Sequence, residues 1–114
     1  MWAVIKFDKK KIHIFKEDLK KKFGDNFQIY YPKLSIQNYQ KNKLKERNIN
    51  LLEDYLFCFH SKFSNEKNIS QLKFLRGVKY FLNGFKESQI EINNFIHNLK
   101  KLENENGYIT QSIY

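Results

Sequence analysis

The sequence has little cysteine and no long hydrophobic segment, and both shortages narrow its class. Its single cysteine, Cys58, allows no disulfide framework within the chain, so a reducing, cytoplasmic environment is expected. The longest apolar run, Tyr55–Phe59, has five residues, whereas a membrane-spanning helix needs about 20. The first residues also lack the basic and then apolar layout of a signal peptide. We therefore expect neither a secreted nor a membrane-spanning protein.

The motifs that usually carry catalysis or hold a cofactor are missing as well. The four glycines are isolated, so there is no glycine-rich phosphate loop. The histidines are far apart in the sequence and lack the spacing of metal ligands: His13, His60 and His97. Cys58 lies between two phenylalanines, where a packed hydrophobic residue is expected rather than a nucleophile. The sequence therefore predicts a protein that is not an enzyme and has no cofactor or metal; a small enzyme assembled by the fold is the weakest alternative.

Positive charge, by contrast, is abundant and unevenly distributed. The 114 residues suit a single domain, and they carry 21 Lys and Arg against 12 Asp and Glu, a net charge of +9. Residues 1–50 hold 13 basic and 5 acidic side chains, whereas residues 51–114 hold 8 and 7. Codon use in an A/T-rich genome is one source of so many lysines. The uneven distribution favours a polyanionic partner, either nucleic acid or an acidic protein face.

Hydrophobic periodicity predicts a strand, a helix and a second strand at the start of the chain. Residues 2–7 alternate as a strand, and residues 27–31 form another, closed by Pro32. Between them, apolar residues gather on one side of a helix: Ile12, Phe15, Leu19 and Phe23. Asp8 is predicted to cap this helix and Gly24 to end it. The polar stretch 33–51 is expected to form a long, exposed hairpin or loop.

In the second half of the chain, the sequence pattern predicts two more strands, each with a helix before or after it. Residues 55–60 are apolar on both faces, which is typical of a central strand. A short helix is expected to begin at Asn68 or Ser70 and to stop at Gly77. Residues 78–82 form the next strand, and a turn follows at positions 83–84.

A third helix is predicted from position 88 onward. Ser88 and Glu91 form a capping-box pair, and a buried stripe follows: Ile92, Phe95, Ile96, Leu99 and Leu102. Residues 108–114 are expected to be either an edge strand or the start of a linker. The order of elements predicts an α+β fold over residues 1–107, a ferredoxin-like sandwich in which an antiparallel sheet of about four strands carries helices mainly on one face.

Three short motifs resemble the N-terminal (NGN) domain of the NusG family of transcription elongation factors. They are residues 2–5 (Trp-Ala-Val-Ile), Tyr31-Pro32 and residues 52–57 (Leu-Glu-Asp-Tyr-Leu-Phe). Residues 55–57 (Tyr-Leu-Phe) and 76–78 (Arg-Gly-Val) are most similar to the specialised RfaH-type paralogues. The resemblance covers nearly all of residues 1–105, in the same element order. The C-terminal KOW barrel of the family does not occur within these 114 residues.

The resemblance implies a monomeric, non-enzymatic transcription elongation or antitermination factor. In this family the domain packs an apolar depression onto the β′ clamp helices of RNA polymerase and touches the β gate loop. It thereby bridges the cleft, suppresses pausing or termination, and faces upstream and non-template DNA. Carried over by position, Leu52, Tyr55 and Phe57 are implied to contact the clamp helices. The implied gate-loop contact lies at Asn68, Ile69 and Ser70.

The DNA-facing side is implied by position to include Lys9, Lys21 and Arg76. Independently, the helical spacing places His13, Lys16 and Lys20 away from the apolar stripe of the first helix, where they can attract phosphates. A guanidinium can bind phosphate or guanine through two hydrogen bonds, so Arg76 ranks above the lysines.

Two departures from the family pattern bear on the clamp-facing depression. The family turn Phe-Pro-Gly-Tyr is replaced by residues 52–55 (Leu-Glu-Asp-Tyr), where Asp54 is expected to take a left-handed backbone and keep the turn. Lys6 stands where RfaH-type proteins have an aromatic residue.

The alternative function is a ferredoxin-like, ribosome-associated RNA-binding module that stacks bases on an open sheet face. The chain lacks the glycine and aromatic pattern that such modules usually carry.

Overall fold

A four-stranded antiparallel sheet forms the centre of the molecule in the computed structural model, which describes residues 1–113 except the side chains at positions 39–40 and 111–113. Its strands are β1 (Trp2–Phe7), β2 (Gln28–Tyr30), β5 (Tyr55–Phe59) and β6 (Val78–Phe81). They lie in the order β2-β5-β1-β6, so β5 is an interior strand, as its apolar sequence predicts. The chain is therefore an α+β protein.

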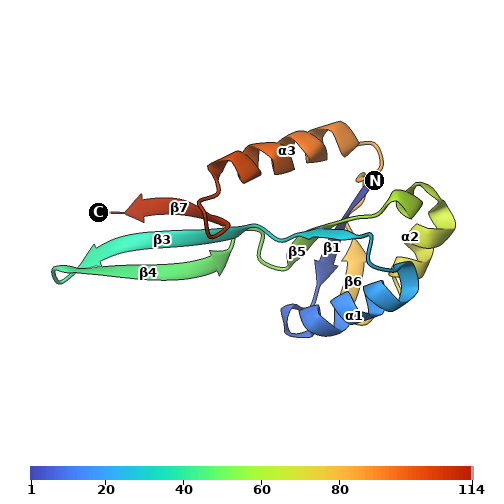
Figure 1. Cartoon of the computed structure of the whole chain (residues 1–114), viewed down its shortest axis with the longest axis horizontal. Helices are drawn as coiled ribbons and strands as arrows, with labels where there is room; N and C mark the ends of the chain where they lie inside the picture. Colours follow the sequence, from blue (N-terminus) through green and yellow to red (C-terminus); the bar gives the residue numbers. More distant parts are fainter. Residues whose placement is uncertain (114) are drawn as a thin grey trace.

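Helices cover both faces of this sheet, because both faces of β1 and β5 are apolar (Figure 1). Helix α1 (Ile12–Phe23) lies on one face with α2 (Glu66–Leu72) beside it, and α3 (Gln89–Leu102) lies on the other. On the α3 side the Trp2 indole donates to Asn93 Oδ1 at 2.9 Å. The expectation that helices lie mainly on one face thus needs correction for α3: side chains at alternate positions of each strand need their own cover.

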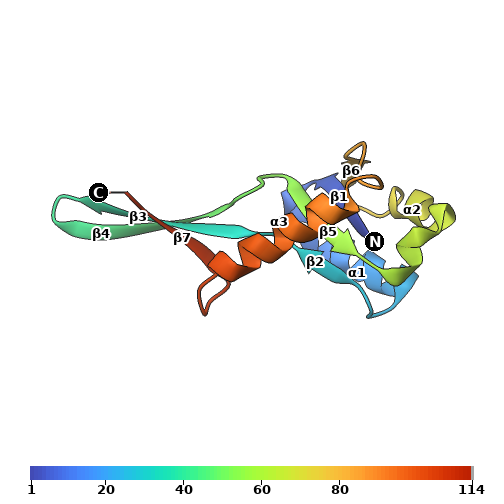
Figure 2. The same ribbon diagram turned by 90° about the horizontal axis from the view of Figure 1, so that it is seen from above.

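A second sheet of three strands projects from this body and gives the molecule a long axis of 55 Å (Figure 2). Strands β3 (Lys33–Gln40) and β4 (Lys43–Asn50) form the predicted hairpin. Its two turn residues both have positive φ, 52° at Lys41 and 62° at Asn42. Strand β7 (Tyr108–Ile113) pairs parallel to β3 at the edge of this sheet. Tyr114, the last residue of the expected edge strand or linker, lies outside the described residues.

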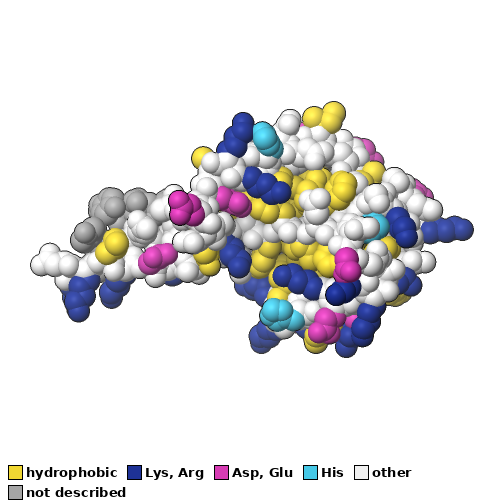
Figure 3. All heavy atoms as spheres, in the orientation of Figure 1, with side chains coloured by type: hydrophobic (Ala, Val, Ile, Leu, Met, Phe, Trp, Pro, Cys, Tyr) yellow, Lys and Arg dark blue, Asp and Glu magenta, His cyan; other side chains and the backbone are white. Residues whose placement is uncertain are grey.

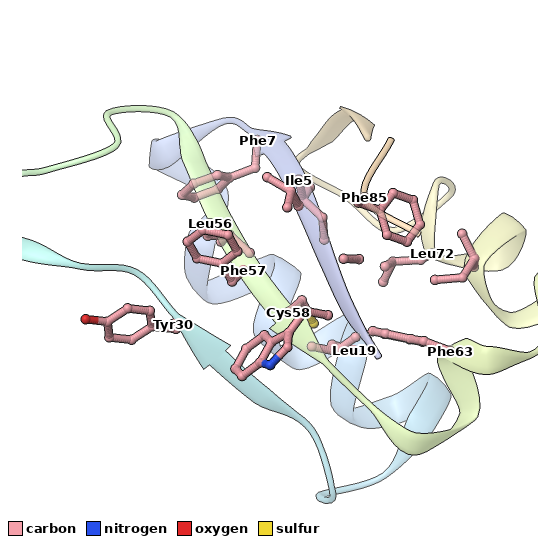
Figure 4. Packing of buried hydrophobic residues seen from close by; sticks show 14 of the residues in the cluster. Ile5, Phe7, Leu19, Tyr30, Leu56, Phe57, Cys58, Phe63, Leu72 and Phe85 are labelled. Carbon is pink, nitrogen blue, oxygen red and sulfur yellow. The ribbon is translucent and has the colours of Figure 1, made fainter. Parts of the chain in front are cut away.

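The core is built from aromatic and branched side chains between β1, β5 and the helices (Figure 4). On α1 the predicted stripe is buried at Phe15, Leu19 and Phe23, and Gly24 ends the helix with φ 78°. Cys58 is fully buried in this core, as the sequence predicts. His60, only 2% exposed, also lies there. Its Nε2 contacts the Phe23 carbonyl at 3.1 Å, and its Nδ1 accepts from the Lys62 amide.

Several predicted boundaries differ from the structure. Asp8 caps a 3-10 helix, Lys9–Lys11, that precedes α1. Helix α2 begins at Glu66 behind an Asn65 cap, before both expected starts, and it ends at Leu72 rather than at Gly77. The early start follows from a second 3-10 helix, Ser61–Ser64, which directly precedes the Asn65 cap. Residues 73–77, between the end of α2 and β6, form turns and a bend.

The predicted capping box at α3 is wrong. The Ser88 side chain makes no capping hydrogen bond, because its backbone (φ −105°, ψ 20°) is not extended. The stripe of α3 is also narrower than expected. Ile92 and Ile96 are buried, but Phe95 is 42% exposed and Leu102 is 64% exposed.

Candidate apolar groove and basic surfaces

An open, apolar groove lies on the α3 side of the sheet, next to the start of that helix. Its volume is about 440 Å³. The apolar lining side chains are Val4 from β1, Leu52, Tyr55 and Phe57 around the start of β5, Leu82 and Phe85 after β6, and Ile92 from α3. Asn83, Gly84 and Ser88 complete the lining. The three residues carried over as clamp contacts therefore line one groove. Phe57 forms its floor, being 5% exposed, whereas Leu52 and Tyr55 are half-buried.

A tyrosine pair with a lysine lies at the Tyr55 end of the groove. The Tyr55 and Tyr80 hydroxyls are 3.0 Å apart, and Lys6 Nζ lies 5.5 and 5.7 Å from the two ring centroids. The hydrogen bond, in which either hydroxyl can be the donor, raises the pKa of Tyr55 and lowers the pKa of Tyr80. Lys6 is not among the residues that line the groove. It stands beside the groove and interacts with aromatic faces, so the lining stays apolar.

The turn that presents Leu52 keeps its shape without glycine or proline. The Tyr55 amide donates to the Leu52 carbonyl at 3.1 Å. The left-handed residue is Glu53, with φ 54°, so the expectation for Asp54 is wrong by one position. Asp54 instead pairs with Lys9 at 3.4 Å, and Tyr31 donates its hydroxyl proton to the Glu53 carbonyl. These contacts fix the turn from two sides.

The implied gate-loop residues lie together on α2 but face different ways. Ile69 is 5% exposed and packs in the core, so its side chain is not available to a partner. Asn68 is half-buried, and its Nδ2 donates to the Lys62 carbonyl at 2.8 Å. Ser70 is exposed. Only Asn68 and Ser70 remain as surface candidates.

The side chains expected to face DNA are all exposed, and three of them have acidic partners. The exposed set is Lys9, His13, Lys16, Lys20, Lys21 and Arg76. Lys20 lies 3.4 Å from Asp25, and Lys9 pairs with Asp54 as described above. These pairs are on the surface and are worth little in stability, so a phosphate can compete for either lysine.

Arg76 is held by a two-bond ion pair with Asp18 of α1. Its Nη2 lies 2.7 Å from Oδ1 and its Nε 3.0 Å from Oδ2, and its backbone amide also donates to Asp18. These hydrogen bonds lower the pKa of Asp18 to about 2. The pair brings Arg76 beside α1. The charge of Lys21 also lowers the pKa of Asp18. Two protons on Nη1 and one on Nη2 remain for a ligand.

Most of the groove lining was not predicted from sequence. Leu82, Phe85 and Ile92 come from segments that the motifs do not cover, and no single spacing connects them. Val4 was recognisable as part of an apolar strand. The alternation of that strand, however, indicates only that Val4 shares a face with Trp2. Their convergence depends on β6 and α3 packing beside β1.

Among residues 1–113 no three His, Cys, Asp or Glu side chains gather to hold a metal ion. Burial raises the pKa of the Cys58 thiol to about 12, which keeps it protonated. None of the helices in this range has the length and apolar composition that crossing a membrane requires.

No protein-family model and no curated protein matches the chain.

Proposed function

We propose that this chain is a polymerase-binding domain of the NusG type, a non-enzymatic transcription elongation factor that docks on the clamp helices of RNA polymerase. One observation carries the proposal: Leu52, Tyr55 and Phe57, carried over from the family as clamp contacts, line a single apolar groove. The lining is continuous across segments far apart in the sequence, so the groove is a property of the fold and not of one motif.

The arrangement of the sheet supports the same family. Strands β1 and β2, joined by α1, are not neighbours, because β5 lies between them; β6 lies on the other side of β1. Such a split strand-helix-strand unit is the ferredoxin-like arrangement, which we propose for the four-stranded sheet. The projecting β3–β4–β7 sheet is an addition to it.

A pair of amphipathic helices is the partner that such a groove suits. A helix presents apolar anchors at positions i, i+3 or i+4 and i+7, and these fill a groove of this kind. Burying one large side chain contributes roughly 1.5–3 kcal/mol, so Leu52 and Tyr55, both half-buried now, have surface left to gain. Asn68 and Ser70 would meet the gate loop, and the exposed cations of α1 would face DNA.

The RNA-binding alternative has less support. Base stacking needs aromatic rings on an open sheet face, but α3 covers the face that holds Phe57, and Phe57 is 5% exposed. The other face is covered by α1 and α2 (Figure 1).

A pull-down with purified RNA polymerase tests the proposal. Leu52→Asp places a charge in the groove, and Tyr55→Ala removes one wall. We expect each variant to weaken polymerase binding at least roughly tenfold, the effect of losing about 1.4 kcal/mol or more. Ile90→Asp is the matched control, because Ile90 is 75% exposed and does not line the groove. Unchanged binding by both groove variants would reject the clamp contact.

A further inference from the structure

Three of the four Lys and Arg side chains of β3 and β4 lie on one face of the hairpin, and Lys33, at its base, lies on the other. Alternate residues of β4 point to the same side, so Lys43, Lys45 and Arg47 share a face, and all three are exposed. Glu46 is the hairpin's one acidic residue, and it lies on the opposite face, where Ser35 Oγ donates to it at 2.8 Å. The ion pairs found among residues 1–113 involve none of the three cations. Their charge is therefore unneutralised within the described chain.

The rest of this face excludes base stacking as the mode of binding. The strand register places Asn38 beside Lys45, Ile36 beside Arg47 and Leu34 beside Ile49. No described side chain of β3 or β4 on this face is aromatic. Proteins that bind single strands combine a basic groove with aromatic stacking platforms, so a single strand is not the favoured ligand.

The dimensions of the hairpin match a nucleic-acid duplex. Neighbouring cations on one strand face lie about 6.8 Å apart, which is the axial advance of about two phosphates along one strand of B-form DNA. The hairpin also projects from the body (Figure 2). Dark blue Lys and Arg side chains line its outer part in Figure 3.

From these observations we infer that the face formed by Lys43, Lys45 and Arg47 binds the phosphate backbone of a nucleic-acid duplex. No residue of the hairpin belongs to the groove or to the α1 surface, so the inference goes beyond the proposed function and does not need the groove to bind polymerase. Lys41, exposed at the hairpin tip, extends the same charge outward.

Fluorescence anisotropy over a series of NaCl concentrations tests the inference, with a labelled 20-base-pair duplex of arbitrary sequence as DNA and as RNA. We compare the wild-type chain with the triple variant Lys43→Ala, Lys45→Ala, Arg47→Ala. Three lost phosphate contacts should reduce the slope of log K against log salt by about 2.7 for B-form DNA. Binding near 100 mM NaCl should weaken at least roughly tenfold. The duplex that binds more tightly to the wild type identifies the source of the backbone.

Three controls separate this surface from net charge, folding and the groove. Lys62→Ala, Lys67→Ala, Lys101→Ala removes the same charge from exposed sites elsewhere. Lys43→Arg, Lys45→Arg, Arg47→Lys preserves the charge and should keep the wild-type slope. Leu52→Asp should bind duplex as the wild type does, so failure of the groove proposal and failure of this inference are distinguishable.

Results of two kinds would overturn the inference. One is an unchanged salt slope in the hairpin variant, or an equal loss in the Lys62, Lys67 and Lys101 control. The other is an equal loss of affinity for a single-stranded 20-mer, which would mean that the face does not require a duplex.

Discussion

Asp18 and Arg76 show how one side-chain pair can fasten two distant segments. The Asp18 side chain is 15% exposed and accepts from both the side chain and the backbone of Arg76. The carboxylate joins α1 to the loop before β6 at a point where the sequence shows only an acidic residue and a remote arginine. Arg76 is expected from sequence to face DNA, and the ion pair gives the same guanidinium a structural role.

The pH dependence of stability tests this pair. Asp18 has a pKa of about 2 in the folded chain and about 3.9 when unfolded. The unfolded chain therefore binds more protons, so the contribution of the pair is present above about pH 4 and is lost as the pH falls toward 2. We expect Arg76→Ala to flatten the fall of the urea midpoint between pH 5 and pH 2.

Nuclear magnetic resonance titration of the Asp18 carboxyl provides the direct measurement. In the Arg76→Ala variant its pKa should rise only part of the way to normal, because the backbone amide of residue 76 still donates. Asp25 is the control, since its lysine partner makes only a long, exposed contact at 3.4 Å. An Asp18 pKa that does not change in the variant would contradict the assigned cause.

At the scale of elements, hydrophobic periodicity predicted the strands and helices in which one face is buried. Strand β1 matches its predicted range, and α1 buries its predicted stripe and ends at Gly24 as predicted, because a buried face leaves a regular apolar pattern at period two or 3.6. The start of α2 was missed because its cap, Asn65, follows a 3-10 helix that leaves no periodic signal. The capping box at Ser88 was a false match: the residue types are present, but the backbone that lets the serine oxygen reach the helix amides is not.

Asn65 and Ser88, at the N-cap positions of α2 and α3, make a matched test of capping. Asn65 Oδ1 accepts from the Lys67 amide at 3.0 Å, whereas the Ser88 side chain accepts from no helix amide. We expect Asn65→Ala to lower the free energy of unfolding by about 1 kcal/mol. Ser88→Ala should change it by less than about 0.5 kcal/mol. Chemical denaturation of the two variants measures both values, and an equal loss would mean that Ser88 caps α3 in solution.

At the scale of the whole molecule, the residues of the candidate groove were predictable from sequence only where they lie close together in one segment. Leu52, Tyr55 and Phe57 lie within six consecutive positions, so a local motif suffices to find them. Leu82, Phe85 and Ile92 join them only through the packing of β6 and α3, which no local pattern encodes. The second sheet was missed for the same reason: β7 pairs parallel to β3 across more than 70 residues of chain, and strand pairing of that range leaves no signal in either segment alone.

The two sheets should differ in local stability. In the central sheet, Ile5 and Cys58 are fully buried under helices, whereas β4 exposes every side chain from Lys43 to Ile49. Backbone hydrogen bonds with few buried apolar contacts open at lower free energy. We expect the amides of β4 that bond to β3 to exchange with deuterium at least about tenfold faster than those of Ile5 and Cys58.

Hydrogen-exchange mass spectrometry with and without duplex then connects this difference to binding. A ligand protects the region whose opening it opposes, so a duplex seated on the hairpin should slow exchange in β3 and β4 and leave β1 and β5 unchanged. Slowing confined to α1 would instead assign duplex binding to the cations of that helix. Equal exchange in both sheets of the free chain would show that the projecting sheet opens only when the core does, and that the hairpin has no independent stability for a ligand to shift.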